Sequence, residues 1–173
     1  MREPVMGLTF EKVWAMFQET DRQSKETDRK INKLGNRLGD SIEDIVRSNL
    51  SERFKELHFN FGQIGTDIRF EDSEGKSIAE VDIMPGNGDD VVAMDVKTKL
   101  TTQDAREHAK RMEKLRKYAD NRNYKRDPMG AVAGAIVPEN VKQFALNSGF
   151  FVIEQSGYTV KIDVPPGFVP KKW

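Results

Sequence analysis

Residues 77–100, SIAEVDIMPGNGDDVVAMDVKTKL, contain two apolar runs separated by a turn rich in Gly and Asp. Charged residues interrupt the runs at regular positions, and such alternation is typical of strands that bury one face. The pattern predicts two antiparallel strands joined by the PGNGDD turn. If this turn is symmetric about its centre, Asp82 lies opposite Ala93, and Glu80 lies opposite Asp95.

In this register, one face of the strand pair carries four charged side chains: Glu80, Asp82, Asp95 and Lys97. Directly opposed Cβ atoms lie about 5 Å apart and diagonal ones about 7 Å apart, so two carboxylates on this face can converge on one ion. The other face carries the apolar side chains that enter the core: Val81, Ile83, Val92, Met94 and Val96. A slip of one residue would break this arrangement, because side chains alternate between faces.

The remaining segments predict an α/β layer structure in which helices cover a mixed sheet. Strands are expected at 62–72 and 130–137 and in a closing hairpin at 150–164, and helices at 41–57, 101–120 and 138–149. The strand at 130–137, GAVAGAIV, reads as buried on both faces and suits a central position. A tail at 165–173 is expected to be extended at most.

The N-terminal part has heptad spacing. Residues three and four apart recur along one helical stripe: Phe10, Val13, Phe17, Thr20, Ser24, Thr27, Ile31, Leu34, Leu38, Ser41 and Ile45. Two interpretations stay open, a stalk for parallel dimerisation and a polar helix that folds onto its own domain or frays. With Gly35 and Gly39 at the junction and Asp40 as a helix N-cap, the expected parts are an arm at 1–39, a domain at 40–164 and the tail.

Composition limits the classes of function. Lys plus Arg equals Asp plus Glu at 28 each, so any attraction to a polyanion must be local. The absence of cysteine excludes disulfides, thiolate metal sites and a cysteine nucleophile, and it fits a reducing compartment. With no long apolar run and no apolar leader at the N-terminus, we expect a cytoplasmic protein that does not enter a membrane.

Several carboxylates on one sheet face repel one another, and a shared divalent cation such as Mg²⁺ removes this cost. An ammonium group at Lys97 would lie beside the metal-bound water, and Glu43, on the predicted helix at 41–57, could add a direct or water-mediated ligand. Such a site suits phosphodiester hydrolysis. The alternative is that Asp95 and Lys97 form a surface ion pair and that Asp82 is a solvated acid near a turn.

Helical Glu43, EVDI with Asp82, and DVK with Asp95 and Lys97 on the next strand resemble the PD-(D/E)XK nuclease superfamily. The resemblance covers roughly residues 40–164. It is strongest to prokaryotic members that carry a coiled-coil arm and a domain similar to Holliday-junction resolvases and restriction endonucleases.

The resemblance implies a restriction-endonuclease-like αβββαβ core acting as a DNA endonuclease. It implies that Asp82 and Asp95 bind Mg²⁺ or Mn²⁺, that the Val96 carbonyl adds a ligand and that Lys97 assists the water. The helix at 101–120 lacks a clear match to the Gln/Tyr motif of RecB-like nucleases, which leaves the substrate open.

Residues 110–126 hold eight Lys or Arg and two acids, with Tyr118 and Tyr124 interleaved. Such a segment could follow a phosphate backbone, or it could be an ordinary solvated helix face. The candidate nucleic-acid contacts are Lys99, Gln103, Lys110, Arg111 and Lys114. His108 is interpreted as a packing residue rather than a catalytic one. The alternative function is an inactive nuclease-fold scaffold or an oligomerising nucleic-acid-binding protein, with the arm forming a homodimer or higher oligomer.

Overall fold

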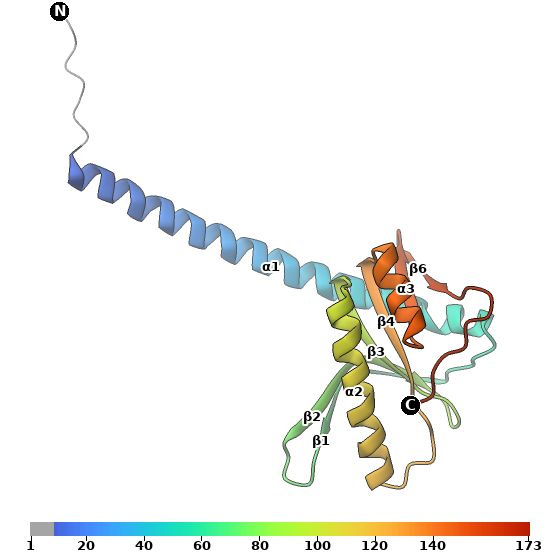
Figure 1. Ribbon diagram of the computed structural model, residues 1–173. Coiled ribbons are helices and arrows are strands. Elements are labelled where there is room, and N and C mark those ends of the chain that lie inside the picture. Colours follow the sequence, from blue (N-terminus) through green and yellow to red (C-terminus); the bar gives the residue numbers. More distant parts are fainter. Residues whose placement is uncertain (1–8) are drawn as a thin grey trace, which may run out of the picture. The chain divides into compact units, whose positions relative to one another are not determined.

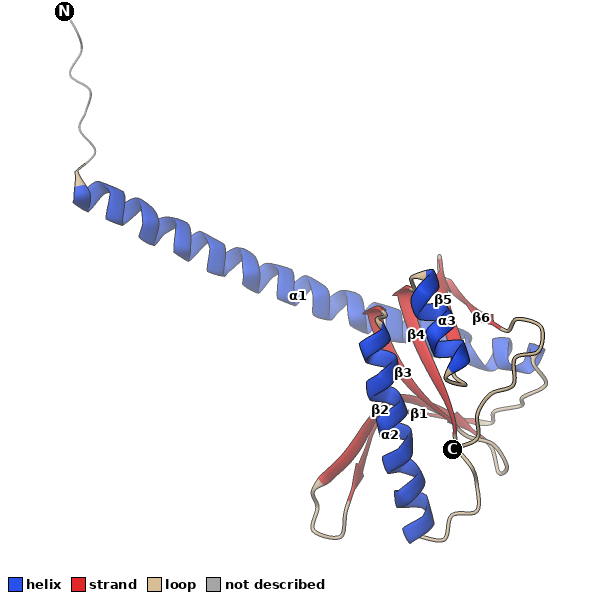
Figure 2. Ribbon diagram, in the orientation of Figure 1, coloured by secondary structure: helices blue, strands red, loops and turns tan. Residues whose placement is uncertain are grey.

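The computed structural model describes residues 9–173 (Figures 1 and 2), so residues 1–8 of the predicted arm lie outside the described part. Its elements are α1 (Phe10–Glu56), β1 (Gln63–Glu71), β2 (Ser77–Gly86), β3 (Val92–Lys99), α2 (Thr102–Asn121), β4 (Met129–Ile136), α3 (Glu139–Asn147), β5 (Phe151–Ser156) and β6 (Thr159–Asp163). The chain divides into two compact units, and the boundary between them in the sequence lies between Leu38 and Gly39.

Helix α1 is continuous across this division, so the predicted helix start at Asp40 is wrong. A glycine inside a helix costs only about 1 kcal/mol relative to alanine, and the long helix tolerates both Gly35 and Gly39. Among the described helices, none is long and apolar enough to cross a membrane.

The sheet has six strands in the order β1-β2-β3-β4-β5-β6. Strands β1, β2 and β3 form an antiparallel meander, β3, β4 and β5 run parallel, and β6 returns antiparallel to β5. Helices α2 and α3 make the two parallel crossovers (Figure 2). The predicted α/β class and mixed sheet are confirmed, with β4 in the interior of the sheet as expected for a strand buried on both faces.

Two apolar cores lie on opposite faces of the sheet. On one face, the C-terminal part of α1 packs against the sheet through Ile42, Val46, Leu50 and Phe54. On the other face, α2 and α3 pack through Ala105, Met112, Leu115, Val141 and Ala145. Alternate residues of the middle strands enter the two cores, as Met94 and Ala93 show. The N-terminal end of α2 is fixed by a capping box between Thr101 and Asp104.

The β1–β2 hairpin changes its exposed face partway along. Ile83 enters the core under α1, whereas Val81, expected on the same face, enters the core under α2. In β1, Asp67 has a left-handed backbone with φ of 50°, and it lies between the paired residues Thr66 and Ile68. Aspartate adopts this conformation more readily than most residues. The two faces of the hairpin therefore exchange sides near Asp67 and Asp82.

We predict that Gly130→Ala destabilises the second unit. A Cβ at this position would lie 2.5 Å from Cε1 and 2.7 Å from Cδ1 of Phe150, whose ring is fully buried and cannot move freely. Such overpacking costs on the order of 2 kcal/mol in the free energy of unfolding, measurable by urea denaturation. Gly88→Ala is the matched control, because its Cβ would meet no atom within 4 Å. Equal stabilities of the two variants would contradict this packing.

Candidate active site

The two aspartates of the predicted site lie directly across from each other. Ile83 pairs with Met94, and Gly86 bridges to Val91. Continuing this register places Asp82 opposite Asp95, so the predicted pairing of Asp82 with Ala93 is wrong by two residues. A shift of two keeps Asp82, Asp95 and Lys97 on one face, so the two acids still meet, whereas Val81 lies on the face opposite to the predicted one.

The physical reason for the shift is the turn. Pro85 and Gly86 belong to β2, and the turn begins only at Asn87. The Asn87 side-chain oxygen accepts hydrogen bonds from the backbone amides of Asp89 and Asp90, at 2.8 and 2.7 Å. This local bond moves the centre of the turn by one residue, which changes the register by two.

Strands β2 and β3 separate at the acidic pair. In the described part of the chain, no pairing joins the two strands beyond Ile83 and Met94 on this side. The Val96 amide instead donates a 2.8 Å hydrogen bond to Oδ2 of Asp82. The carboxylate therefore takes a position where a neighbouring strand would otherwise bond.

Burial is the main cause of the raised pKa of both Asp82 and Asp95. The charge of Asp95 raises the pKa of Asp82 further, while the Val96 amide opposes the rise. A hydrogen bond between the two carboxyl groups raises the pKa of Asp82 and lowers that of Asp95. The two carboxyl groups are thus close enough to share one proton.

Two cations balance Asp95, whose side chain is only 7% exposed. The Lys97 ammonium nitrogen lies 3.7 Å from its Oδ1, and Nη1 of Arg111 lies 3.4 Å from the same oxygen. The Lys97 side chain is 41% exposed, so it also faces solvent. The structure thus brings Asp82, Asp95 and Lys97 together in one place, as the sequence pattern predicted.

His108 holds Arg111 in position from a fully buried site on α2. Its Nε2 lies 2.9 Å from the Ala93 carbonyl oxygen, and its Nδ1 lies 2.8 Å from Nη1 of Arg111. Because a carbonyl only accepts and a guanidinium only donates, the ring is neutral with its proton on Nε2. Burial lowers the pKa of His108 to about 4, in agreement with this form. Sequence analysis did not assign Arg111 to a contact with Asp95. The only indication in the sequence was the i, i+3 spacing of His108 and Arg111, which places both side chains on one face of α2.

Glu43 lies on α1 beside an acidic hollow of about 200 Å³, which Thr66 and Asp67 also line. Burial, then the charges of Asp82 and Asp67, raise the pKa of Glu43. Among the described residues, no three His, Asp or Glu side chains form a group able to hold one metal ion. The effect of the Asp82 charge on the pKa of Glu43 places Glu43 near the acidic pair. Its role as a direct or water-mediated ligand stays a prediction. Asp67 is an additional acid that the sequence pattern did not indicate.

The five predicted nucleic-acid contacts follow β3 and α2. Lys99 ends β3, and Gln103, in the first turn of α2, bonds to Glu107 at 3.3 Å. The other three, Lys110, Arg111 and Lys114, line one hollow of about 390 Å³ together with Glu80. Arg111 contacts Asp95 of the acidic pair, and Lys110 and Lys114 share the hollow with Arg111. The nucleic-acid contacts of all five residues stay predictions.

The donor set of the pair fits a hard divalent cation. Burial disfavours the ionisation of both adjacent carboxylates, so both gain from a shared cation, and both offer oxygen ligands of the kind that Mg²⁺ prefers. The Val96 carbonyl as a third ligand stays a prediction. No protein-family model matches the chain, and no curated protein matches it in sequence.

We predict that Asp82→Asn raises thermal stability at neutral pH. The folded-state pKa of Asp82 lies above its ordinary value of 3.8, so ionisation opposes folding at neutral pH, and this penalty disappears as the pH falls through the raised pKa. Asparagine keeps an oxygen that accepts from the Val96 amide. We expect a melting temperature higher by roughly 2–4 °C at pH 7, the change that 1 kcal/mol produces in a domain of this size.

The gain should shrink as the pH is lowered and be absent below 3.8. Asp89→Asn, in the exposed turn, is the control and should leave the melting temperature unchanged. A loss of stability in Asp82→Asn at pH 7 would show that the carboxylate stabilises the fold instead.

Proposed function

We propose that this protein hydrolyses phosphodiester bonds in nucleic acid, with DNA as the expected substrate and Mg²⁺ or Mn²⁺ as the cofactor. The observation that carries the proposal is the meeting of Asp82, Asp95 and Lys97 where β2 and β3 separate. The order of the C-terminal part of α1, the β1–β3 meander, α2 and β4 supports a restriction-endonuclease-like αβββαβ core.

In this proposal, Asp82 and Asp95 hold the cation, the Val96 carbonyl contributes a ligand, and Glu43 contributes through water. A divalent cation supplies positive charge that stabilises the negative charge developing on the phosphate. The Lys97 ammonium orients the attacking water and donates hydrogen bonds to a phosphate oxygen. Arg111, with Lys110 and Lys114 in the same hollow, holds neighbouring phosphates of the strand.

We expect Lys97→Ala to reduce metal-dependent nicking of supercoiled plasmid DNA by about 100-fold or more, because the ammonium at the attacked phosphate is lost. The measurement is agarose-gel cleavage in Mg²⁺ and in Mn²⁺, with circular dichroism to confirm the fold. Lys76→Ala, in the exposed β1–β2 turn, is the control and should cut at the wild-type rate.

Calorimetric titration with Mn²⁺ separates binding from chemistry. Lys97→Ala should still bind Mn²⁺, and Asp95→Asn should not. If the wild type neither cleaves supercoiled, linear or branched DNA nor binds Mn²⁺, the catalytic proposal is wrong.

A second candidate function is a scaffold that oligomerises through the arm without catalysis. It is favoured by the exposed apolar stripe along the arm, which includes Phe10, Phe17, Ile31, Leu34 and Leu38. Ion pairs within the helix stabilise the surrounding surface, as between Arg22 and both Glu19 and Glu26. Because an isolated polar helix is marginal in water, a second copy of the same stripe is the partner that this spacing fits. A homodimer or higher oligomer is compatible with either function.

We predict that Ile31→Glu in the full chain lowers the oligomeric state, since it places a charge in the seam. Arg29→Glu, two residues away on the outer face, is the matched control and should leave the mass unchanged. Light scattering after size-exclusion chromatography measures both. A monomeric wild type at micromolar concentration, or equal masses for both variants, would exclude association through this stripe.

A further inference from the structure

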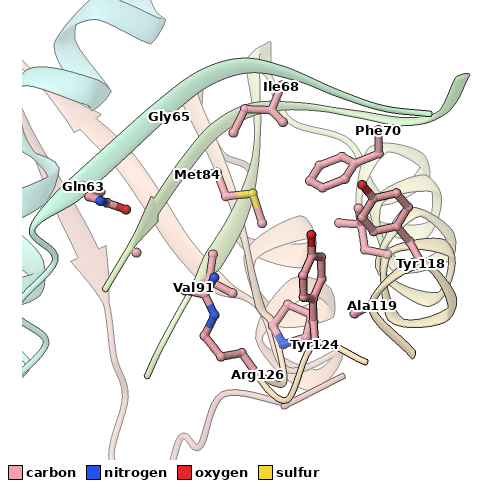
Figure 3. Close-up of a pocket in the computed structure, with 13 residues that line it drawn as sticks. Gln63, Gly65, Ile68, Phe70, Met84, Val91, Tyr118, Ala119, Tyr124 and Arg126 are labelled. Carbon is pink, nitrogen blue, oxygen red and sulfur yellow. The ribbon is translucent and has the colours of Figure 1, made fainter. Parts of the chain in front are cut away.

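Another hollow lies between the β1–β2 hairpin and the C-terminal half of α2, with a volume of about 440 Å³ (Figure 3). Its lining is largely apolar and aromatic: Ile68, Phe70, Met84, Leu115, Tyr118 and Tyr124. Figure 3 shows the rings of Tyr118 and Tyr124 and the thioether of Met84 facing this space. The volume is within the range of pockets that bind small molecules, about 300–1,000 Å³. We call this hollow the tyrosine pocket.

The two tyrosines differ in their freedom to contact a ligand. Tyr118 is held by an edge contact with Phe70 at 5.1 Å and by the guanidinium of Arg122, 3.7 Å from its ring centre. Tyr124 follows α2, is 56% exposed, and lies 6.3 Å from Tyr118 between ring centres. Within residues 9–173, neither phenol hydroxyl forms a hydrogen bond. Tyr124 thus offers a free ring face and both tyrosines offer free hydroxyls.

Basic residues lie along α2 and the segment that follows it, next to the tyrosine pocket. Of the eight Lys and Arg residues at 110–126, only Arg111 and Arg116 form ion pairs with carboxylates in the described part of the chain. The six others are Lys110, Lys114, Lys117, Arg122, Lys125 and Arg126. Arg126 lines the pocket and donates to the Asn87 carbonyl at 2.6 Å. A ligand that combines a planar ring with negative charge fits this environment.

Adjoining hollows connect the tyrosine pocket to the acidic pair. The hollow that contains Arg111 shares Ile78 and Lys114 with a third hollow of about 420 Å³. Tyr118 lines both this third hollow and the tyrosine pocket. Because a helix rises 1.5 Å per residue, Arg111 and Tyr118 are about 10 Å apart along α2. A strand of one or two nucleotides spans such a distance.

We infer that the tyrosine pocket binds an unpaired base of a single-stranded nucleic acid, with the base stacked on Tyr124 and the phosphates along the basic residues of α2. This inference rests on the proposed function, since it assigns the same strand to the pocket and to Asp82 and Asp95. A base within a duplex is stacked and paired, so it cannot enter the pocket. The substrate class is therefore nucleic acid with a single-stranded segment, such as a flap, a gap or a free end.

The test is equilibrium binding of a fluorescein-labelled single-stranded oligonucleotide and of a blunt duplex of equal length, by anisotropy in EDTA. Tyr124→Ala should weaken single-strand binding by roughly 5- to 100-fold, the effect of removing one stacking ring, and should change duplex binding less than twofold. Tyr124→Phe keeps the ring and should restore binding. Tyr158→Ala removes a more exposed ring, at 94% against 56%, from the β5–β6 turn and is the control.

Equal losses for single strand and duplex would overturn the inference, as would unchanged binding in Tyr124→Ala or an equal loss in Tyr124→Phe. Tyr124-dependent binding of free mononucleotides without oligonucleotide binding would assign the pocket to a small molecule instead. Because the assay excludes divalent cations, its result is independent of hydrolysis. Cleavage that depends on Lys97 without any effect of Tyr124 would reject this inference alone, whereas an absence of nucleic-acid binding both with and without a divalent cation would reject both proposals.

Discussion

The structure depends on placing two carboxylates side by side at the point where two neighbouring strands separate. Burial and repulsion raise the pKa of both Asp82 and Asp95, so the pair opposes folding when ionised at neutral pH. The surrounding residues offset this cost locally. The Val96 amide bonds to Asp82, and Lys97 and Arg111 face Asp95. Structural proteins have little reason to keep such a pair, since buried charges seldom stabilise a fold.

The separation of the strands also shapes the surface next to the pair. Asp67 adopts a left-handed backbone beside the break, and the hairpin turns so that Val81 packs toward α2 rather than α1. The hairpin and α2 consequently enclose hollows on their flanks, one containing Arg111 and another containing Tyr124. Backbone strain of this kind is often found at functional sites, where the surrounding packing compensates for it. The left-handed residue and the two hollows thus all belong to the β1–β2 hairpin or border it.

The sequence predicted the site better than it predicted the backbone around it. Because side chains alternate between the faces of a strand, the pattern assigned Asp82, Asp95 and Lys97 to one face. A register shift of two residues does not change this assignment. The register of β2 and β3 depends on the Asn87 side chain, which accepts hydrogen bonds from two backbone amides of the turn. The assumption of a symmetric turn did not take these bonds into account. The contact of Arg111 with Asp95 joins a helix to a strand 16 positions earlier, and the i, i+3 spacing of His108 and Arg111 indicated only that these two side chains share one face of α2. The continuity of α1 through Asp40 was not predicted because the two glycines and Asp40 were interpreted as a boundary, whereas a glycine inside a helix costs only about 1 kcal/mol relative to alanine.

Charge balance connects the acidic pair to its proposed substrate. With Asp82 and Asp95 ionised, their two negative charges are matched by Lys97 and Arg111, so the pair is close to neutral without a metal. A divalent cation would leave an excess of two positive charges, which is unfavourable in a partly buried site unless an anion enters with it. A phosphodiester group supplies one negative charge, and nearby Glu43 supplies another on ionisation. Cation and phosphate should therefore bind cooperatively, with Arg111 moving its contact from Asp95 toward the phosphate. His108 contacts the same guanidinium nitrogen, Nη1, that faces Asp95.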